Sequence, residues 1–348
     1  MPNGNLMRHE IHEQPTVIER LLSSQRPAAT DLVQHLARRQ ISQVVIAARG
    51  TSDNAGRYAQ YLLGGMNGLV VALATPSLFT LYRRPPRLAK ALVLGISQSG
   101  RSPDIIAVLA EARRQGALTA VMTNETGSEL AAQADVVLDL CAGEERAVAA
   151  TKTYTAELAA IALLSAILSD EREMAEALGR LPQAVSEALQ LEEASAEAAA
   201  QLREMQAAVV IGRGFNYSTA FELALKIKEL TYTSTEAYSS ADFRHGPLAL
   251  VQPGFPVIGI AATGPLLPDM LALLEAVKER QADITWISDD PQPASVHGRA
   301  LVVPRHVPEW LTPIPLIVPG QLLAFHLALA RGYDVDAPRS ITKITETY

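Results

Sequence analysis

The chain has 348 residues, of which 48% are hydrophobic and 19% charged, and its formal net charge is −7. This length allows two domains of ordinary size, and the composition excludes a disordered or fibrous protein. The acidic balance argues against a general nucleic-acid-binding protein, so an anionic ligand must be held by local hydrogen-bond donors.

A helical segment is expected at 1–34, and beyond it short β-branched runs alternate with longer segments rich in Ala, Leu, Glu and Arg. This alternation is the pattern of parallel strands that helices cover on both faces. Residues 166–206 are predicted to form one continuous helix between two halves of the chain. The predicted strands lie near 43–48, 69–73, 91–96, 118–123 and 135–140, and then near 208–212, 255–260, 283–287 and 300–303.

The second half repeats the first. An apolar strand ending in Arg-Gly occurs at 44–50 and again at 209–214, and Val-Leu-Gly-Ile at 93–96 matches Val-Ile-Gly-Ile at 257–260, both with an offset of 164 positions. The coincident offsets predict an internal duplication of the α/β class: two tandem doubly wound parallel-sheet domains, each a flavodoxin-like α-β-α sandwich. The expected organisation is a first domain at 35–168, connecting helices at 169–205, a second domain at 206–332 and a tail at 333–348.

Several classes of protein are not expected. Residues 311–330 approach the length of a membrane span, but three prolines interrupt them, and they are predicted to form a buried helix. The polar start of the chain does not resemble a secretion signal, and the single cysteine, Cys141, favours a reducing compartment, so a cytoplasmic location is expected. No metal-ligand spacing occurs, and 212–214 lacks the third glycine of a dinucleotide-binding motif, so neither a metal nor a cofactor is expected.

A hydroxyl-rich loop, Ser-Gln-Ser-Gly-Arg-Ser-Pro-Asp at 97–104, follows a predicted strand and opens a helix. The hydroxyls of Ser97, Ser99 and Ser102, together with the free N–H groups of the helix start, could hold a phosphate. The alternative is a serine-rich turn that only caps its own helix. The counterpart loop at 261–264 has lost most hydroxyls although it needs the same turn, which favours the ligand-binding interpretation. A second hydroxyl-rich turn at 50–54 could reach the same ligand.

Glu222, Lys226 and Glu229 are spaced so that they share one face of a predicted helix. One interpretation is a solvated stripe with an ordinary ion pair between the first two residues. The other is a set of acid–base groups, and it is favoured by His245, which follows soon afterwards in a Gly-Pro turn where its imidazole is free to titrate.

Over nearly its whole length the sequence resembles the isomerase part of glucosamine-6-phosphate synthase and, more broadly, the two-domain SIS (sugar isomerase) family. The segments that carry the resemblance are Glu-Ile-His-Glu-Gln-Pro at 10–15, Arg-Gly-Thr-Ser at 49–52, Ile-Ser-Gln-Ser-Gly at 96–100, Ala-Thr-Lys at 150–152, Glu229, His-Gly-Pro-Leu-Ala at 245–249 and Asp-Val-Asp-Ala-Pro-Arg at 334–339.

The resemblance implies an enzyme that binds a sugar phosphate and is active as a homodimer. Glu229 would be the base that moves a proton between C1 and C2. His245, contributed by the neighbouring subunit, would open the sugar ring, and Lys343 in the tail over the site would form a Schiff base. The implied substrate-binding residues are Thr51, Ser52, Ser97, Gln98, Ser99 and Ser102, the backbone at Val148 and Ala150, and Glu222 and Lys226.

The sequence also departs from the synthase pattern. It starts without the glutamine-hydrolysing domain and its cysteine, Ala150 stands in place of a serine, and Arg-Ser-Pro-Asp at 101–104 replaces a Glu-Thr version; the last two features resemble the stand-alone SIS deaminases. The expected reaction is therefore glucosamine 6-phosphate and water to fructose 6-phosphate and ammonia. A fructosamine-6-phosphate deglycase or another aldose–ketose isomerase is an alternative. A non-catalytic sugar-phosphate sensor is another, and it would not need Glu229, His245 and Lys343.

Overall fold

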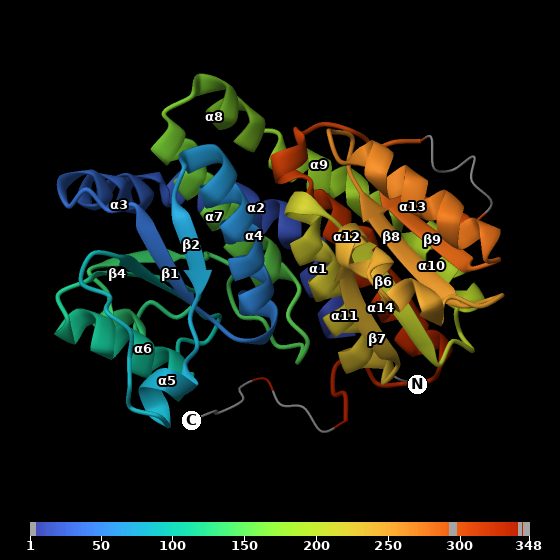
Figure 1. Cartoon of the computed structure of the whole chain (residues 1–348), viewed down its shortest axis with the longest axis horizontal. Helices are drawn as coiled ribbons and strands as arrows, with labels where there is room; N and C mark the ends of the chain where they lie inside the picture. The colour runs from blue at the N-terminus through green and yellow to red at the C-terminus, as the bar shows by residue number, and fades with distance from the viewer. Residues whose placement is uncertain (1–4, 292–297, 340–342, 344–348) are drawn as a thin grey trace. The chain divides into compact units, whose positions relative to one another are not determined.

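A computed structural model describes residues 5–291, 298–339 and 343, and it contains two five-stranded sheets (Figure 1). The chain divides into two compact units, each built around one sheet. The first-sheet unit consists of Thr16–Glu145, Lys152–Gly179 and Thr342–Tyr348, and the second-sheet unit consists of Met1–Pro15, Arg146–Thr151 and Arg180–Ile341.

The first sheet has the strand order β2-β1-β3-β4-β5, and every strand pair is parallel. Helices cover both faces, so the central strands β3 and β4 are buried along their whole length. The strands are β1 Gln43–Ala47, β2 Val70–Leu73, β3 Leu92–Ile96, β4 Leu118–Thr123 and β5 Val136–Asp139. The helices of this unit are α2 Gln14–Ser24, α3 Arg26–Arg38, α4 Gly50–Asn67, α5 Ser77–Thr80, α6 Pro103–Arg114, α7 Lys152–Ser169 and α8 Arg172–Leu178.

The second sheet has the order β10-β9-β8-β6-β7, which is the same 2-1-3-4-5 order when its strands are counted from β6. This is the flavodoxin-like order, so the predicted fold class and the two-fold repetition of the sheet are confirmed. The strands are β6 Ala207–Gly212, β7 Ser234–Ser239, β8 Pro256–Ala261, β9 Asp283–Ser288 and β10 Arg299–Val302. The helices are α1 Asn5–His12, α9 Leu181–Ala188, α10 Glu192–Gln201, α11 Tyr217–Thr231, α12 Ser240–Arg244, α13 Leu267–Glu279 and α14 Pro313–Ala330.

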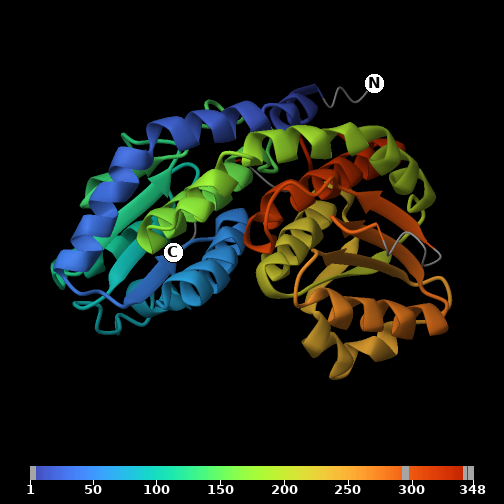
Figure 2. The ribbon, with the colours of Figure 1, turned by 90° about the horizontal axis from the view of Figure 1, so that it is seen from above.

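Helix α14 is apolar apart from Gln321 and His326, and it is the described helix that has the length and composition to cross a membrane. Of its 18 residues, 83% are buried. It packs against α9, α10 and α11 of its own unit, and in Figure 2 the red helix α14 and the orange helix α13 lie on opposite faces of the second sheet. A core helix has the same composition as a membrane span, and the burial agrees with the sequence prediction of a buried helix.

Two predictions of secondary structure were wrong. Strand β7 was missed, because it lies at the edge of the sheet and alternates exposed and buried side chains instead of forming an apolar run. The continuous helix predicted over 166–206 is broken into α7, α8, α9 and α10. One break lies at Asp170, whose φ of +53° is left-handed, and another lies just before α9, which begins with a proline in its first turn.

An ion pair is repeated in both units at the same place. Arg49, directly after β1, binds Asp104 at the start of α6 with Nε 2.7 Å from Oδ2. Arg213, directly after β6, binds Asp269 at the start of α13 with a nitrogen–oxygen distance of 2.8 Å. Both arginines are extended and both precede a glycine of positive φ, +53° and +61°. The duplication therefore reaches from the strand order down to single side-chain contacts.

The repeat also provides a matched stability test at Gly95 and Gly259. A Cβ atom at Gly259 would lie 2.2 Å from the rigid ring of Trp286, whereas a Cβ at Gly95 would lie 3.1 Å from a methyl group of Leu109. Gly259→Ala should lower the free energy of unfolding by about 1–3 kcal/mol, and Gly95→Ala by clearly less, because a leucine can adjust. Urea denaturation measures both, and equal losses would contradict this account.

Candidate active site

The two hydroxyl-rich segments lie at the ends of the neighbouring strands β1 and β3. Residues 50–54 begin α4 after β1, and residues 97–102 join β3 to α6. In a sheet of this order the chain leaves these two strands towards opposite faces, and the crevice beyond their carboxyl ends is the usual ligand site. The sequence therefore has its small hydroxyl side chains at the topological switch point of the first sheet.

Hydrogen bonds fix the backbone of the 97–102 loop. Ser97 Oγ accepts the N–H of Gly100 at 3.1 Å, and the carbonyl oxygen of Gln98 accepts the N–H of Asn124 at 3.2 Å. Gly100 has φ +62°, and a Cβ atom there would lie 2.1 Å from Ser128 Oγ. The loop is thus held in one conformation by its own serine and by the segment after β4, which lowers the entropy cost of binding.

The hydroxyls of this region are used unequally. Ser102 is at the N-cap position that the sequence predicted, but within the part of the chain that the structure describes its hydroxyl makes no capping bond. Ser52 Oγ is buried and donates to Glu157 Oε1 at 2.7 Å, so its hydroxyl hydrogen is already committed. Ser99 Oγ accepts the N–H of Arg101 at a long 3.4 Å. Ser99 and Ser102 are therefore better placed than Ser52 to donate to an anion.

The counterpart loop in the second-sheet unit has the opposite electrostatics. The N–H of Thr263 donates to Asp289 Oδ1 at 2.6 Å, and Gly264 lies against the carboxylate of Glu309. Burial raises the pKa of Asp289, although hydrogen bonds from Thr263 oppose this shift. Burial and the charge of Asp289 raise the pKa of Glu309. The protein's own carboxylates thus lie where the first unit has its hydroxyls, and this loop would repel an anion.

Helix α11 has a buried cation between two carboxylates. Lys226 Nζ lies 2.6 Å from Glu229 Oε2 and 3.4 Å from Glu222 Oε1. The side chains of Glu222 and Lys226 are 0% and 1% exposed, whereas Glu229 is 23% exposed. The solvated-stripe interpretation is therefore wrong. Burying such charges is costly, so the arrangement is typical of a functional site rather than of a stabilising one.

His245 is exposed at the end of α12, directly before Gly246, whose φ is +133°. Its backbone N–H donates to the carbonyl oxygen of Asp242 at 3.0 Å, which holds the turn. Val148 and Ala150 lie half-buried in the 146–151 segment of the same second-sheet unit. An exposed imidazole is compatible with the prediction that His245 serves a neighbouring subunit, which stays a prediction.

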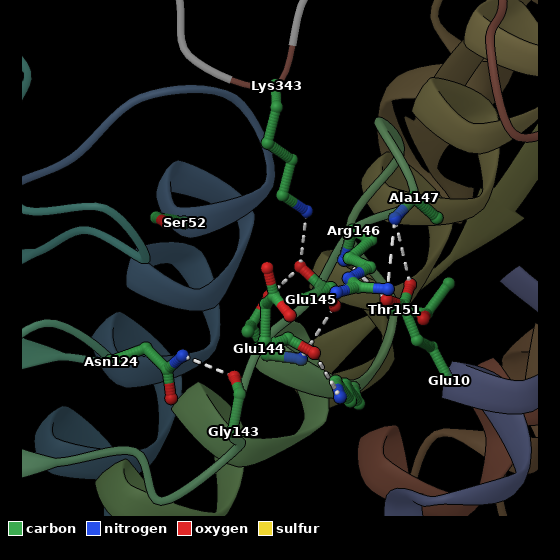
Figure 3. A network of polar contacts seen from close by, with 12 residues as sticks. Glu10, Ser52, Asn124, Gly143, Glu144, Glu145, Arg146, Ala147, Thr151 and Lys343 are labelled. Carbon is green, nitrogen blue, oxygen red and sulfur yellow. Dashed lines mark hydrogen bonds and ion pairs between the residues drawn. The ribbon is translucent and has the colours of Figure 1, made fainter. Parts of the chain in front are cut away.

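Lys343 belongs to the first-sheet unit and forms an ion pair with Glu145, a residue that no sequence pattern pointed to. Figure 3 shows its amine directed at Glu145, with Nζ 2.7 Å from Oε2. The Glu145 side chain is fully buried and also accepts from the N–H of Thr153, at 3.1 Å, and from its hydroxyl, at 2.8 Å, at the start of α7. To act as a nucleophile, Lys343 must leave this carboxylate and lose a proton.

Comparison with known proteins identifies the family. The model of the SIS domain family matches residues 39–167 and 201–330. The chain belongs to the SIS domain family. This SIS protein is 35% identical over 344 residues to the isomerizing glutamine–fructose-6-phosphate aminotransferase of Pyrococcus horikoshii, an alignment that covers 97% of this chain and 57% of the relative. The chain therefore spans little more than half the length of that relative.

Solved structures extend the comparison. The SIS fold described here matches a candidate phosphosugar isomerase from Silicibacter pomeroyi with a TM-score of 0.86 and 33% identity, over 95% of this chain and 99% of that one. It also matches a glucosamine-6-phosphate deaminase from Thermotoga maritima with a TM-score of 0.77 over 99% and 100% of the two chains. At 21% identity the second match shows the fold alone. The chain is thus a SIS protein of the phosphosugar isomerase type.

A serine substitution tests whether the 97–102 loop of the first SIS domain binds phosphate. Ser102→Ala should weaken the binding of inorganic phosphate about tenfold, because a hydrogen bond to a charged ligand is lost. It should leave the melting temperature nearly unchanged, since the hydroxyl does not cap α6 in the described structure. Isothermal titration calorimetry measures the affinity, and Thr263→Ala in the counterpart loop is the matched control. Equal phosphate affinity in Ser102→Ala and the wild type would rule out this loop as the phosphate site.

Proposed function

We propose that this SIS protein deaminates glucosamine 6-phosphate, giving fructose 6-phosphate and ammonia, in the cytoplasm. The observation that carries the proposal is the buried Glu222–Lys226–Glu229 set on α11. A site that only binds a sugar phosphate does not need Glu229 as a base. A site that moves a carbon-bound proton needs a carboxylate that the substrate can reach, and Glu229, which is partly exposed and fixed in position by Lys226, has this property.

The proposed reaction begins with the phosphate held by the hydroxyls and N–H groups of the 97–102 loop. His245 opens the ring and frees the C1 aldehyde. Glu229 then takes the proton from C2, and the electron pair forms the C1–C2 double bond of an enolamine while the aldehyde oxygen takes up a proton. Glu229 returns its proton to C1, which leaves an imine at C2. Water adds to this imine and ammonia leaves, so the atoms of substrate and water balance those of the two products.

Lys343 has a further part in the proposal. Its amine can attack the C2 imine in place of water, which releases ammonia, and water then hydrolyses the resulting Schiff base to the ketone and the free amine. In the described structure the Glu145 carboxylate holds this amine 2.7 Å away. Glu145 can therefore receive the proton that Lys343 must lose before it attacks, because a carboxylate at hydrogen-bond distance is placed to act as a base.

Two features favour deamination over the alternatives. Ala150 and the Arg-Ser-Pro-Asp stretch at 101–104 depart from the synthase pattern in the way that stand-alone SIS deaminases do. A deglycase or another aldose–ketose isomerase would use the same proton transfer on a different sugar phosphate, so these are outcomes of a substrate panel. A non-catalytic sensor would keep its ligand affinity without any need for Glu229.

The first test assays ammonia and fructose 6-phosphate from glucosamine 6-phosphate. Glu229→Gln should lower kcat by about 10²–10⁴-fold, because the base for the C2 proton is lost, while the Kd for fructose 6-phosphate changes little. Glu275→Gln, an exposed carboxylate on α13, is the control and should keep full activity. Product from fructosamine 6-phosphate alone would favour the deglycase, and binding without turnover of any sugar phosphate would favour the sensor.

The second test asks whether His245 acts across a homodimer interface. His245→Ala and Glu229→Gln should each be inactive as separate proteins. If His245 serves the neighbouring subunit, a mixed dimer contains one intact site, and an equal mixture should recover roughly a quarter of the wild-type activity. Unfolding and refolding the two variants together allows subunits to exchange before the assay. If the refolded mixture stays inactive although mixed dimers have formed, His245 acts within its own chain.

A further inference from the structure

The 146–151 segment is fixed at its start by a residue of the N-terminal helix. The carboxylate of Glu10 on α1, only 4% exposed, accepts the backbone N–H groups of Arg146 and Ala147, and the distance from Ala147 N to Oε2 is 3.2 Å (Figure 3). Both residue 10 and this segment belong to the second-sheet unit. Two consecutive N–H groups directed at one carboxylate determine how the peptide plane between them is turned.

The other end of the segment is fixed by two glutamines. Gln321 on α14 donates from Nε2 to the carbonyl oxygen of Thr151 at 3.3 Å, and Gln14 donates to Gln321 Oε1 at 2.9 Å. Both glutamine side chains are fully buried. Gln14, like Glu10, comes from the stretch at 10–15, so this short stretch controls both ends of the 146–151 segment. Val148 and Ala150 lie between these two attachments.

Helix α1 is itself held in place independently of Glu10. Asp336 accepts the N–H of Met7 at 3.0 Å and that of Leu6 at 3.4 Å, which satisfies donors at the start of the helix. On the same helix Arg8 and His12 bind Glu192 of α10 at 2.7 and 2.9 Å. Glu10 therefore extends from a fixed support, and its contact with the 146–151 segment is separate from the contacts that anchor the helix.

We propose that Glu10 is a positioning residue that sets the backbone of Val148 and Ala150 for binding the sugar part of the substrate. This inference rests on the proposed function, in which that backbone contacts the sugar. Glutamine in place of Glu10 has one acceptor oxygen instead of two, and its NH2 group would face a backbone donor. The substitution therefore turns the peptide plane without emptying the space that the side chain fills.

The test compares Glu10→Gln with Glu192→Gln, which weakens the contact of Arg8 and His12 on the same helix. In Glu10→Gln the KM for glucosamine 6-phosphate should rise about tenfold with a smaller change in kcat, and the Kd for inorganic phosphate should stay the same. Hydrogen exchange at the amides of residues 146 and 147 should become faster. Glu192→Gln should lower stability and leave KM and both amides unchanged. Equal effects of the two variants, or equal losses of phosphate and sugar phosphate affinity, would overturn the inference.

The inference can be judged separately from the proposed reaction. If the wild type does not turn over glucosamine 6-phosphate, the proposed function fails, and the Kd for fructose 6-phosphate together with hydrogen exchange still tests Glu10. An unchanged fructose 6-phosphate affinity in Glu10→Gln then refutes the positioning role.

If the Glu10→Gln variant does not fold, Gln14→Met weakens the opposite end of the 146–151 segment instead. It should raise the same Kd several-fold, and no change would count against the inference.

Discussion

Both sheets depend on the same ion pair. In each unit an arginine directly after the first strand binds an aspartate at the start of the helix that follows the third strand. In the order 2-1-3-4-5 these strands are neighbours, but their helices leave towards opposite faces, so the loops diverge. The Arg49–Asp104 pair joins the two loops across this divergence, and Asp104 is almost fully buried. A buried carboxylate is unfavourable unless a cation accompanies it, and Arg49 supplies this cation beside the 97–102 loop.

The same support occurs in the second-sheet unit, where Arg213 and Arg244 both bind Asp269. The surroundings differ, however. There the loop after the third strand meets Asp289 and Glu309, and the helix after the first strand contains Lys226 between two carboxylates. A duplicated scaffold has thus kept its mechanical contacts and changed its chemistry. One copy has hydroxyl and backbone N–H groups in its loops, and the other has carboxylates and a buried lysine.

The sequence predicted the parts of the fold that depend on local pattern. All strands with a continuous apolar run were located within about a residue, and the common offset of 164 positions revealed the repeat. It also predicted that Glu222, Lys226 and Glu229 share a helix face, since helical spacing alone determines this. It could not show that the face is buried, because burial depends on what packs against α11.

The contacts of Glu10 and Glu145 could not be found in this way either. Glu10 meets Arg146 across 136 positions, and Lys343 meets Glu145 across 198 positions. No periodicity connects residues so far apart, and a lone glutamate in a helix or loop resembles any surface carboxylate. Their one signal was that both lie in or beside stretches carrying the family resemblance, at 10–15 and 150–152. That signal points to a neighbourhood and does not assign a partner.

The packing of Trp286 over Gly259 has a consequence for the history of the two copies. In the first sheet the residue paired with Gly95 is Val121, so a small side chain there corresponds to an indole ring in the second. The indole of Trp286 can pack over position 259 only if residue 259 has no Cβ atom. With the indole in place, any residue other than glycine at 259 would clash with it. Residues 259 and 286 therefore depend on each other, and replacing β9 with its counterpart β4 would put a valine in place of the indole and leave a hole over Gly259. The halves descend from one sequence but are no longer interchangeable parts.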